Sequence, residues 1–272
     1  MHSESSRLTL RETFDEAAAR YDHVRPRYPE ALFDDLAASA GLRPGSRVLE
    51  IGCGTGQATV PLARRGYAVC AVELGARLAE VARANVAPFG TVEVVTAAFE
   101  GWPLPAAPFD AVLAATSFHW LDPDVRLAKA AAALRPGGAL AVVTTHHVAG
   151  GSAEFFDAVQ RCYEAWMPGT PPGLRLPAAT DVPVSGGELQ RGGHFAGAVA
   201  RRFEGDVEYS TEAYLELLCT YSNHLALEPA ARRGLLDCIR KLIDGRFGGR
   251  VVKRYLWELA VAFRPSGADV AG

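Results

Sequence analysis

The stretch VLEIGCGTGQA, residues 48–58, constrains the fold more than any other part of the chain. An apolar run ends at one carboxylate, Glu50, and Gly52, Gly54 and Gly56 then alternate with small residues. Because glycine has no Cβ, the backbone N–H groups of such a turn can approach a ligand closely. The pattern therefore predicts a binding site at the end of a buried strand, in a position that suits a nucleoside.

Short apolar runs alternate with helical segments from Arg47 to about Thr145. The apolar runs are RVLEI, YAVCAVE, VEVVTAA, FDAVLAAT and ALAVVTT. Strand and helix repeated in this way are typical of a parallel sheet whose two faces are covered by helices. We therefore expect an α/β fold, and we expect the final apolar run, VVKRYLWELAVAF, to close one edge of the sheet.

Two common nucleotide motifs do not fit the glycine turn. A dinucleotide fingerprint needs glycine at position 57, where this chain has Gln57, and no G-K-[ST] follows as in a P-loop. A second carboxylate, Glu73, ends the next apolar run, where it can accept hydrogen bonds from both hydroxyls of a ribose. Glu50 is equally compatible with a structural carboxylate behind the turn and with ligand contact.

Composition excludes several classes of partner. The 272 residues have a formal net charge of -3 and a pI near 6.2, which argues against a nucleic-acid partner. The polar N-terminus lacks the apolar core of a signal peptide, and no apolar stretch reaches the ~20 residues that a membrane span needs. The five cysteines include no C-x-x-C pair. We therefore expect a cytoplasmic protein in a reducing compartment, with no bound metal and no membrane partner.

With these features, the sequence resembles the class I S-adenosylmethionine-dependent methyltransferases. The matching parts are VLEIGCGTG (48–56), Glu73, FDAVLAATSFHW (109–120) and LRPGGAL (134–140). The N-terminal FDEAAARYDHVRPRYP (14–29) is similar to small-molecule methyltransferases of the ubiquinone-biosynthesis and trans-aconitate type. The resemblance implies a Rossmann-like, seven-stranded, mostly parallel sheet with helices on both faces and an antiparallel last strand. It also implies S-adenosylmethionine as cofactor and S-adenosylhomocysteine as product.

Carried over residue by residue, the resemblance assigns the cofactor site. The three glycines would face the amino-acid part of the cofactor, Glu73 the ribose, and Leu74 the adenine. Many relatives have an acidic residue near Ala98 that bonds the adenine amine, and this chain has none there. The full predicted set is Tyr21, Arg27, Glu50, Gly52, Gly54, Gly56, Gln57, Glu73, Leu74, Ala98, Phe99 and Ser117.

Methyl transfer from a sulfonium is an in-line displacement, so the enzyme must align the acceptor and exclude water. His119, after the fourth strand, has an ordinary pKa that suits a general base near neutrality; the alternative role is orienting the cofactor or bracing the loop. Trp120 is expected to pack under the next helix. An arginine and phenols in the N-terminal segment can bind the carboxylate of a buried zwitterion. The predicted substrate pocket comprises Tyr28, Phe118, His119, His146, Phe155, Tyr163 and Tyr221.

The pattern along the chain predicts five parts. These are an N-terminal helical lid (1–41) with a short helix near 9–22, a cofactor-binding core (42–147), a helical cover that selects the substrate (148–198), a C-terminal completion of the core (199–264) and a tail (265–272). We expect methyl transfer to a small molecule of specialised or housekeeping metabolism, at a hydroxyl or carboxylate oxygen, by a monomer or homodimer. The alternative is a cyclase-like enzyme or a binding module that keeps the cofactor without consuming it.

Overall fold

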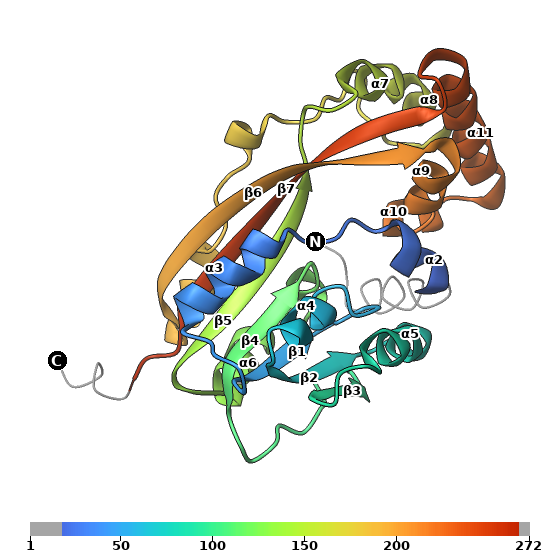
Figure 1. Ribbon diagram of the computed structural model, residues 1–272. Coiled ribbons are helices and arrows are strands. Elements are labelled where there is room, and N and C mark those ends of the chain that lie inside the picture. Colours follow the sequence, from blue (N-terminus) through green and yellow to red (C-terminus); the bar gives the residue numbers. More distant parts are fainter. Residues whose placement is uncertain (1–17, 267–272) are drawn as a thin grey trace.

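One seven-stranded sheet organises the chain, and the computed structural model describes residues 18–266 of it (Figure 1). The strands are β1 (Arg47–Ile51), β2 (Ala68–Glu73), β3 (Val92–Thr96), β4 (Phe109–Ala115), β5 (Leu134–His147), β6 (Ala196–Ser210) and β7 (Arg250–Phe263). Their order is β3-β2-β1-β4-β5-β7-β6. Strands β1 to β5 are parallel, and β7 is antiparallel to both β5 and β6. The predicted Rossmann-like fold with an antiparallel last strand is confirmed.

The position of β7 corrects one expectation. The last strand does not close the sheet edge but lies between β5 and β6, so that β6 is the edge. Nearly every residue from Tyr255 to Ala262 is buried, as in a strand covered on both faces, whereas β6 has few buried residues along its length. The continuous apolar run in the sequence was the signal of an interior strand.

Helices cover both faces of the sheet. The structure has α2 (Ala18–Val24), α3 (Glu30–Ala40), α4 (Thr59–Arg64), α5 (Ala76–Val86), η1 (Phe118–Trp120), α6 (Arg126–Ala133), α7 (Ala153–Ala158), α8 (Gln160–Trp166), η2 (Ala179–Asp181), η3 (Gly187–Gly193), α9 (Thr211–Leu218), α10 (Ser222–Leu225) and α11 (Pro229–Arg246). Residues 9–17 of the predicted N-terminal helix lie outside the described part of the chain. No helix among residues 18–266 is long and apolar enough to cross a membrane.

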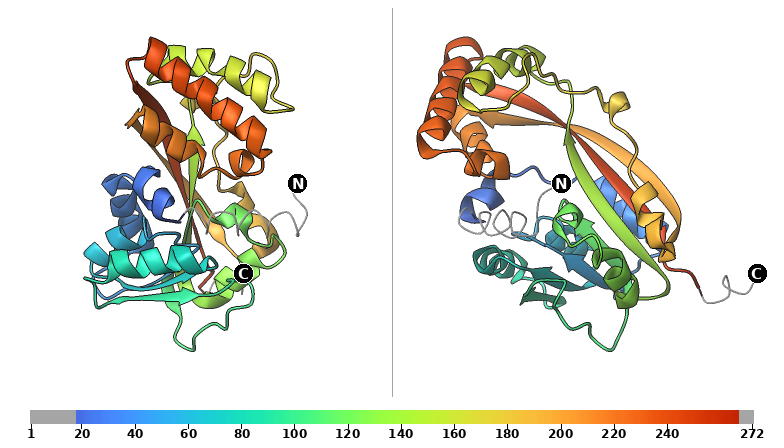
Figure 2. Two further views of the ribbon diagram at one scale, coloured as in Figure 1. Left: turned by 90° about the vertical axis from the view of Figure 1, so that its right-hand side faces the viewer. Right: turned by 180° about the vertical axis from the view of Figure 1, so that it is seen from behind.

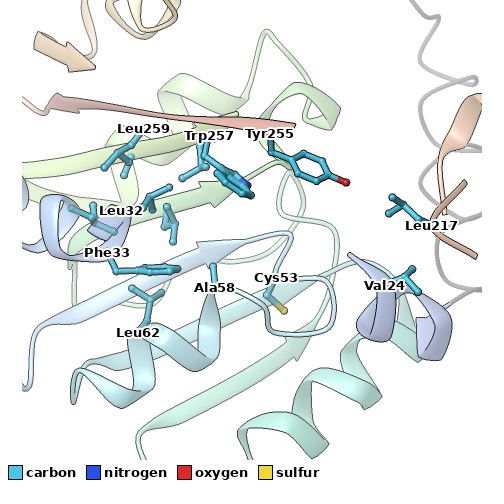
Figure 3. Close-up of a cluster of buried hydrophobic side chains, with 14 of the residues drawn as sticks. Val24, Leu32, Phe33, Cys53, Ala58, Leu62, Leu217, Tyr255, Trp257 and Leu259 are labelled. Atoms are coloured by element: carbon cyan, nitrogen blue, oxygen red, sulfur yellow. The ribbon is translucent and has the colours of Figure 1, made fainter. Parts of the chain in front are cut away.

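Two apolar clusters hold these layers together. On one face, Leu32 and Phe33 of α3 and Leu62 of α4 pack with alternate strand residues such as Trp257 (Figure 3). On the other face, alanines of α6 pack with the intervening strand residues. Burial of apolar area on both sides is the main force that fixes the strands, and with them the ends that form the site.

A second group of helices stands at one end of the long strands β5, β6 and β7. Helices α7 to α11 gather there, at the end away from α6 (Figures 1 and 2). Residues 211–227 do not form one continuous helix, because α9 ends at Leu218 and α10 begins at Ser222. The break occurs where the side chain of Arg25 bonds the Thr220 carbonyl (2.6 Å), which a continuing helix would have used internally.

Cys162 of α8 and Cys238 of α11 form a disulfide, which ties these two helices together. Cys53, Cys70 and Cys219 are free. The sequence contained no local pattern for this bond, because the two cysteines are 76 residues apart.

Candidate active site

The glycine turn lies against the end of β4. Gly52, Gly54 and Gly56 all have positive φ (68°, 57° and 91°), which other residues rarely adopt. A Cβ added to Gly52 would lie 2.7 Å from the Cβ of Ser117. The turn is therefore possible only with glycine, and it leaves its backbone open toward the strand ends.

Glu73 is held beside this turn by backbone hydrogen bonds. One carboxylate oxygen accepts from the N–H of Gly54 (2.8 Å) and the other from the N–H of Gly75 (2.9 Å). Both bonds are charge-assisted, so they fix the carboxylate firmly. A carboxylate oxygen can accept more than one hydrogen bond, so this group is also suited to accept from a ligand hydroxyl.

Glu50 lies behind the turn and is almost fully buried (1 % exposed). Burial, with the charge of Glu73 adding to it, raises the pKa of the Glu50 carboxyl to about 8. Glu50 Oε2 and Gln57 Nε2 are buried without a hydrogen-bond partner in the described part of the chain. Buried polar atoms of this kind are rare unless a ligand or water completes them, so the region fits a polar ligand.

A cavity of about 540 Å³ opens from the turn. Its first half is lined by residues at the ends of β1 to β4: Gly52, Gly54, Glu73, Leu74, Ala97, Phe99, Ser117 and His119. Its second half is lined by residues of α7, α8, α10 with the turn before it, β5 and β7: Phe156, Tyr163, Tyr221, His224, His147 and Lys253. Tyr21 and Arg25 of the N-terminal segment lie on the same wall.

Most predicted cofactor residues line this cavity, namely Tyr21, Gly52, Gly54, Glu73, Leu74, Phe99 and Ser117. Gly56 does not line it. A Cβ added to Gly56 would instead point toward α5 and lie 3.7 Å from the Cα of Ala82. Gln57 lines a second cavity instead, of about 410 Å³, on the other side of Tyr21 and Arg25. Ala97, rather than the predicted Ala98, faces the first cavity.

Arg25, rather than the predicted Arg27, lines the cavity. The Arg25 guanidinium lies 4.6 Å from the ring centroids of both Tyr21 and Tyr221 and donates to Thr220. The side chain of Arg27 is 60% exposed and lies 3.8 Å from the Asp22 carboxylate. Arg25 continues the last turn of α2, since its N–H donates to the Tyr21 carbonyl, and so it faces α10.

The predicted substrate residues divide into three groups. His119, Tyr163 and Tyr221 line the first cavity, and Tyr28 and His146 line the second. Phe118 and Phe155 are packed in the core, which corrects their assignment. The helical register of α7 instead places Phe156 in the cavity, and Trp120, expected to be packing, also lines it.

His119 lies on η1 with its ring 4.8 Å from that of Trp120. Surrounding protein, and then the charge of Arg126, lower the pKa of His119 to about 4. The imidazole is therefore neutral at pH 7 and is a weak proton acceptor there. This weakens its assignment as a general base and favours a hydrogen-bonding role.

Strain marks the same edge of the sheet. Thr116, directly after β4, has a positive φ of 58°, which no other described non-glycine residue has. Its hydroxyl bonds Tyr28 (3.0 Å) and Thr145 (2.9 Å), which hold it in place. Thr116 lines both cavities.

Sequence reasoning missed two basic residues that line the first cavity, Lys253 and Arg25. Lys253 was not among the predicted site residues, although its place in the apolar run VVKRYLWELAVAF was a usable signal. Its Nζ bonds the Tyr221 hydroxyl (3.1 Å), which in turn lies 3.2 Å from His147 Nε2. His224 Nε2 lies 3.1 Å from the Tyr163 hydroxyl.

The fold and this site define a Rossmann-like protein that binds a nucleoside ligand beyond the carboxyl ends of its parallel strands. Residues 48–138 match the methyltransferase domain family. An uncharacterised methyltransferase of Mycobacterium tuberculosis is 37% identical over 142 residues, which are 51% of this chain and 54% of that protein. The chain thus spans about half the length of the curated relatives it matches.

Solved structures of methyltransferases share this fold. A protein of Anaeromyxobacter dehalogenans, provisionally named a type II methyltransferase, is 27% identical with a TM-score of 0.57, over 89% of this chain and 97% of that one. The phosphoethanolamine N-methyltransferase 2 of Haemonchus contortus, solved with S-adenosylhomocysteine, shares the fold at 16% identity and a TM-score of 0.54, over 97% of this chain and 61% of that one. Together these similarities support a class I S-adenosylmethionine-dependent methyltransferase domain, with S-adenosylmethionine as the cofactor.

Proposed function

We propose that this chain transfers the methyl group of S-adenosylmethionine to a small-molecule acceptor, at a hydroxyl or carboxylate oxygen, by in-line displacement. The observation that carries the proposal is one continuous cavity, lined at one end by the glycine turn and at the other by the cover. Its volume of about 540 Å³ lies in the range of small-molecule sites and gives little room for a polymer.

The residues around the glycine turn fit the cofactor. Glu73 would hold the ribose hydroxyls, and the backbone at Gly52 and Gly54 would face the amino-acid part. When bound, the cofactor supplies a methyl group on a positively charged sulfur. The protein's contribution is to orient the acceptor and to exclude water, with residues 1–41 acting as a lid and 148–198 as the substrate-selecting cover.

The charges of the acceptor half favour oxygen over nitrogen. Among the described cavity residues the one carboxylate is Glu73, which is engaged at the turn. The acceptor half instead has Lys253 and Arg25, with neutral histidines and phenols. A protonated amine would meet like charge and no carboxylate there, whereas an oxygen acid would meet donors.

Calorimetric titration with S-adenosylhomocysteine and, in parallel, with NADH tests the cofactor assignment. We expect binding of the first ligand alone, weakened about tenfold or more by Glu73→Ala. The matched control is Glu93→Ala, since Glu93 is an exposed carboxylate of the neighbouring strand β3. Binding that is indifferent to Glu73, or binding of NADH, would contradict the assignment.

Turnover then separates methyl transfer from the alternative role of a cyclase or binding module. A transferase releases S-adenosylhomocysteine in step with a methylated product. An acceptor that is transformed while S-adenosylmethionine stays intact would replace the proposed function by the alternative.

A further inference from the structure

Lys253 is a buried basic side chain in the wall of the cavity. It lies on β7 and is 2% exposed. Three tyrosine rings surround its Nζ, with centroids 5.1 Å (Tyr221), 5.4 Å (Tyr255) and 5.8 Å (Tyr214) away. The rings partly stabilise an ammonium through cation–π attraction of ~0.5–2 kcal/mol, which is small beside the cost of burying a charge.

No counter-charge accompanies this lysine in the described part of the chain. Its Nζ has one hydrogen-bond acceptor there, the Tyr221 hydroxyl. The other buried charge of the same strand, Glu258, is treated differently: Arg202 pairs with it at 2.7 Å. Buried charges in proteins are almost always paired, so a partner for Lys253 is missing.

The groups that face Lys253 do not supply one. They come from the segment after α2, from β5, α9, α10 and its preceding turn, and β7: Arg25, His147, Tyr214, Tyr221, His224 and Tyr255. Burial lowers the pKa of His147 to about 2 and that of His224 to about 4, and raises that of Tyr221 to about 12. None of these groups is an anion at pH 7. Burial, and then Arg25, hold the pKa of Lys253 well below its usual range.

Much of the remaining wall of this half is apolar, although Gln160, Thr170, Ser222 and Asn223 also line the cavity. The apolar residues include Phe156, Val159, Met167, Leu174, Leu176 and Leu218. A ligand that fills the space therefore needs an apolar body, and a ligand that satisfies Lys253 needs one anionic end.

We infer that Lys253 binds an acidic oxygen of the methyl acceptor, a carboxylate or an ionised phenol on an apolar body. The inference rests on the proposed function for the statement that this ligand is the acceptor. The bound pair is an ammonium and an oxyanion. A phenol reaches that state by giving its proton to the lysine amine, whereas a carboxylate reaches it when the amine takes a proton from solvent.

The first experiment uses para-nitrophenol, whose ionised form absorbs visible light. It is added to the protein saturated with S-adenosylhomocysteine, at a pH where the free probe is mainly un-ionised. We expect the visible band to appear with the wild type and with Lys241→Met, an exposed lysine of α11, and to be lost in Lys253→Met. The neutral methyl ether para-nitroanisole should bind the wild type and Lys253→Met alike.

The second experiment titrates para-nitrobenzoate by calorimetry in two buffers of different ionisation enthalpy. The wild type should take up protons when the ligand binds and Lys253→Met should take up none, with affinity at least about tenfold weaker. The two probes distinguish the two kinds of acidic ligand. Binding of the phenol produces the visible band without net proton uptake, whereas binding of the carboxylate is accompanied by proton uptake. Lys253→Met and the second variant Lys253→Gln should fold, because removing an unpaired buried charge is not destabilising.

Acid binding that is independent of Lys253, or absent for both probes, overturns the inference. Binding of S-adenosylhomocysteine keeps the two proposals apart, because it should be equal in the wild type and in both Lys253 variants. If the wild type fails to bind S-adenosylhomocysteine, the proposed function fails; if it binds while lysine-dependent acid binding is missing, only the inference fails.

Discussion

Glu50 should make the stability of this protein fall as pH rises. Its carboxyl has an ordinary pKa of 4.5, which the fold raises to about 8. Between these values the folded state keeps a proton that the unfolded state has released, so the free energy of unfolding decreases with pH. Below pH 4.5 the contribution is fully present, and above about pH 8 it is lost. At 1.36 kcal/mol per pKa unit the loss reaches about 5 kcal/mol.

Glu50→Gln removes this titration and keeps the shape of the protonated side chain. We expect the free energy of unfolding of the variant to match that of the wild type below the window and to exceed it by up to about 5 kcal/mol above the window. Urea denaturation of both proteins at several pH values measures the difference, in which the titration of all other groups cancels. A difference that stays constant with pH would refute the assignment of Glu50 as a buried, proton-binding carboxyl.

Three further changes test the site and the cover. Gly52→Ala should abolish S-adenosylhomocysteine binding in calorimetry, because its Cβ would lie 2.7 Å from a serine Cβ at positive φ; normal binding would contradict the close turn. Reduction of the Cys162–Cys238 disulfide should lower the free energy of unfolding by up to about 4 kcal/mol, and denaturant curves unchanged by reductant would argue against the bond. Arg25→Ala should weaken S-adenosylhomocysteine binding severalfold, whereas Arg27→Ala should leave this binding unchanged and alter stability by about 0.5 kcal/mol or less; an equal loss of binding in the two variants would contradict the arginine assignment.

The sequence by itself determined the α/β class, the glycine turn and the carboxylate at the end of β2. These features are local: apolar runs bounded by turns define the strands, and the glycine turn directly follows one of them. Glu73 could be placed because parallel strands end at one edge of the sheet, so two strand ends meet without further information.

Tertiary structure alone decided which side chains meet across the cavity. The insertion of β7 between β5 and β6 brings Lys253 beside Tyr221, and the break between α9 and α10 gives Arg25 its partner at Thr220. Arg25 and Thr220 are 195 residues apart in the sequence, so no local pattern links them. Periodicity reports which face of an element is buried, whereas the identity of its neighbour depends on how the whole set of buried faces packs together.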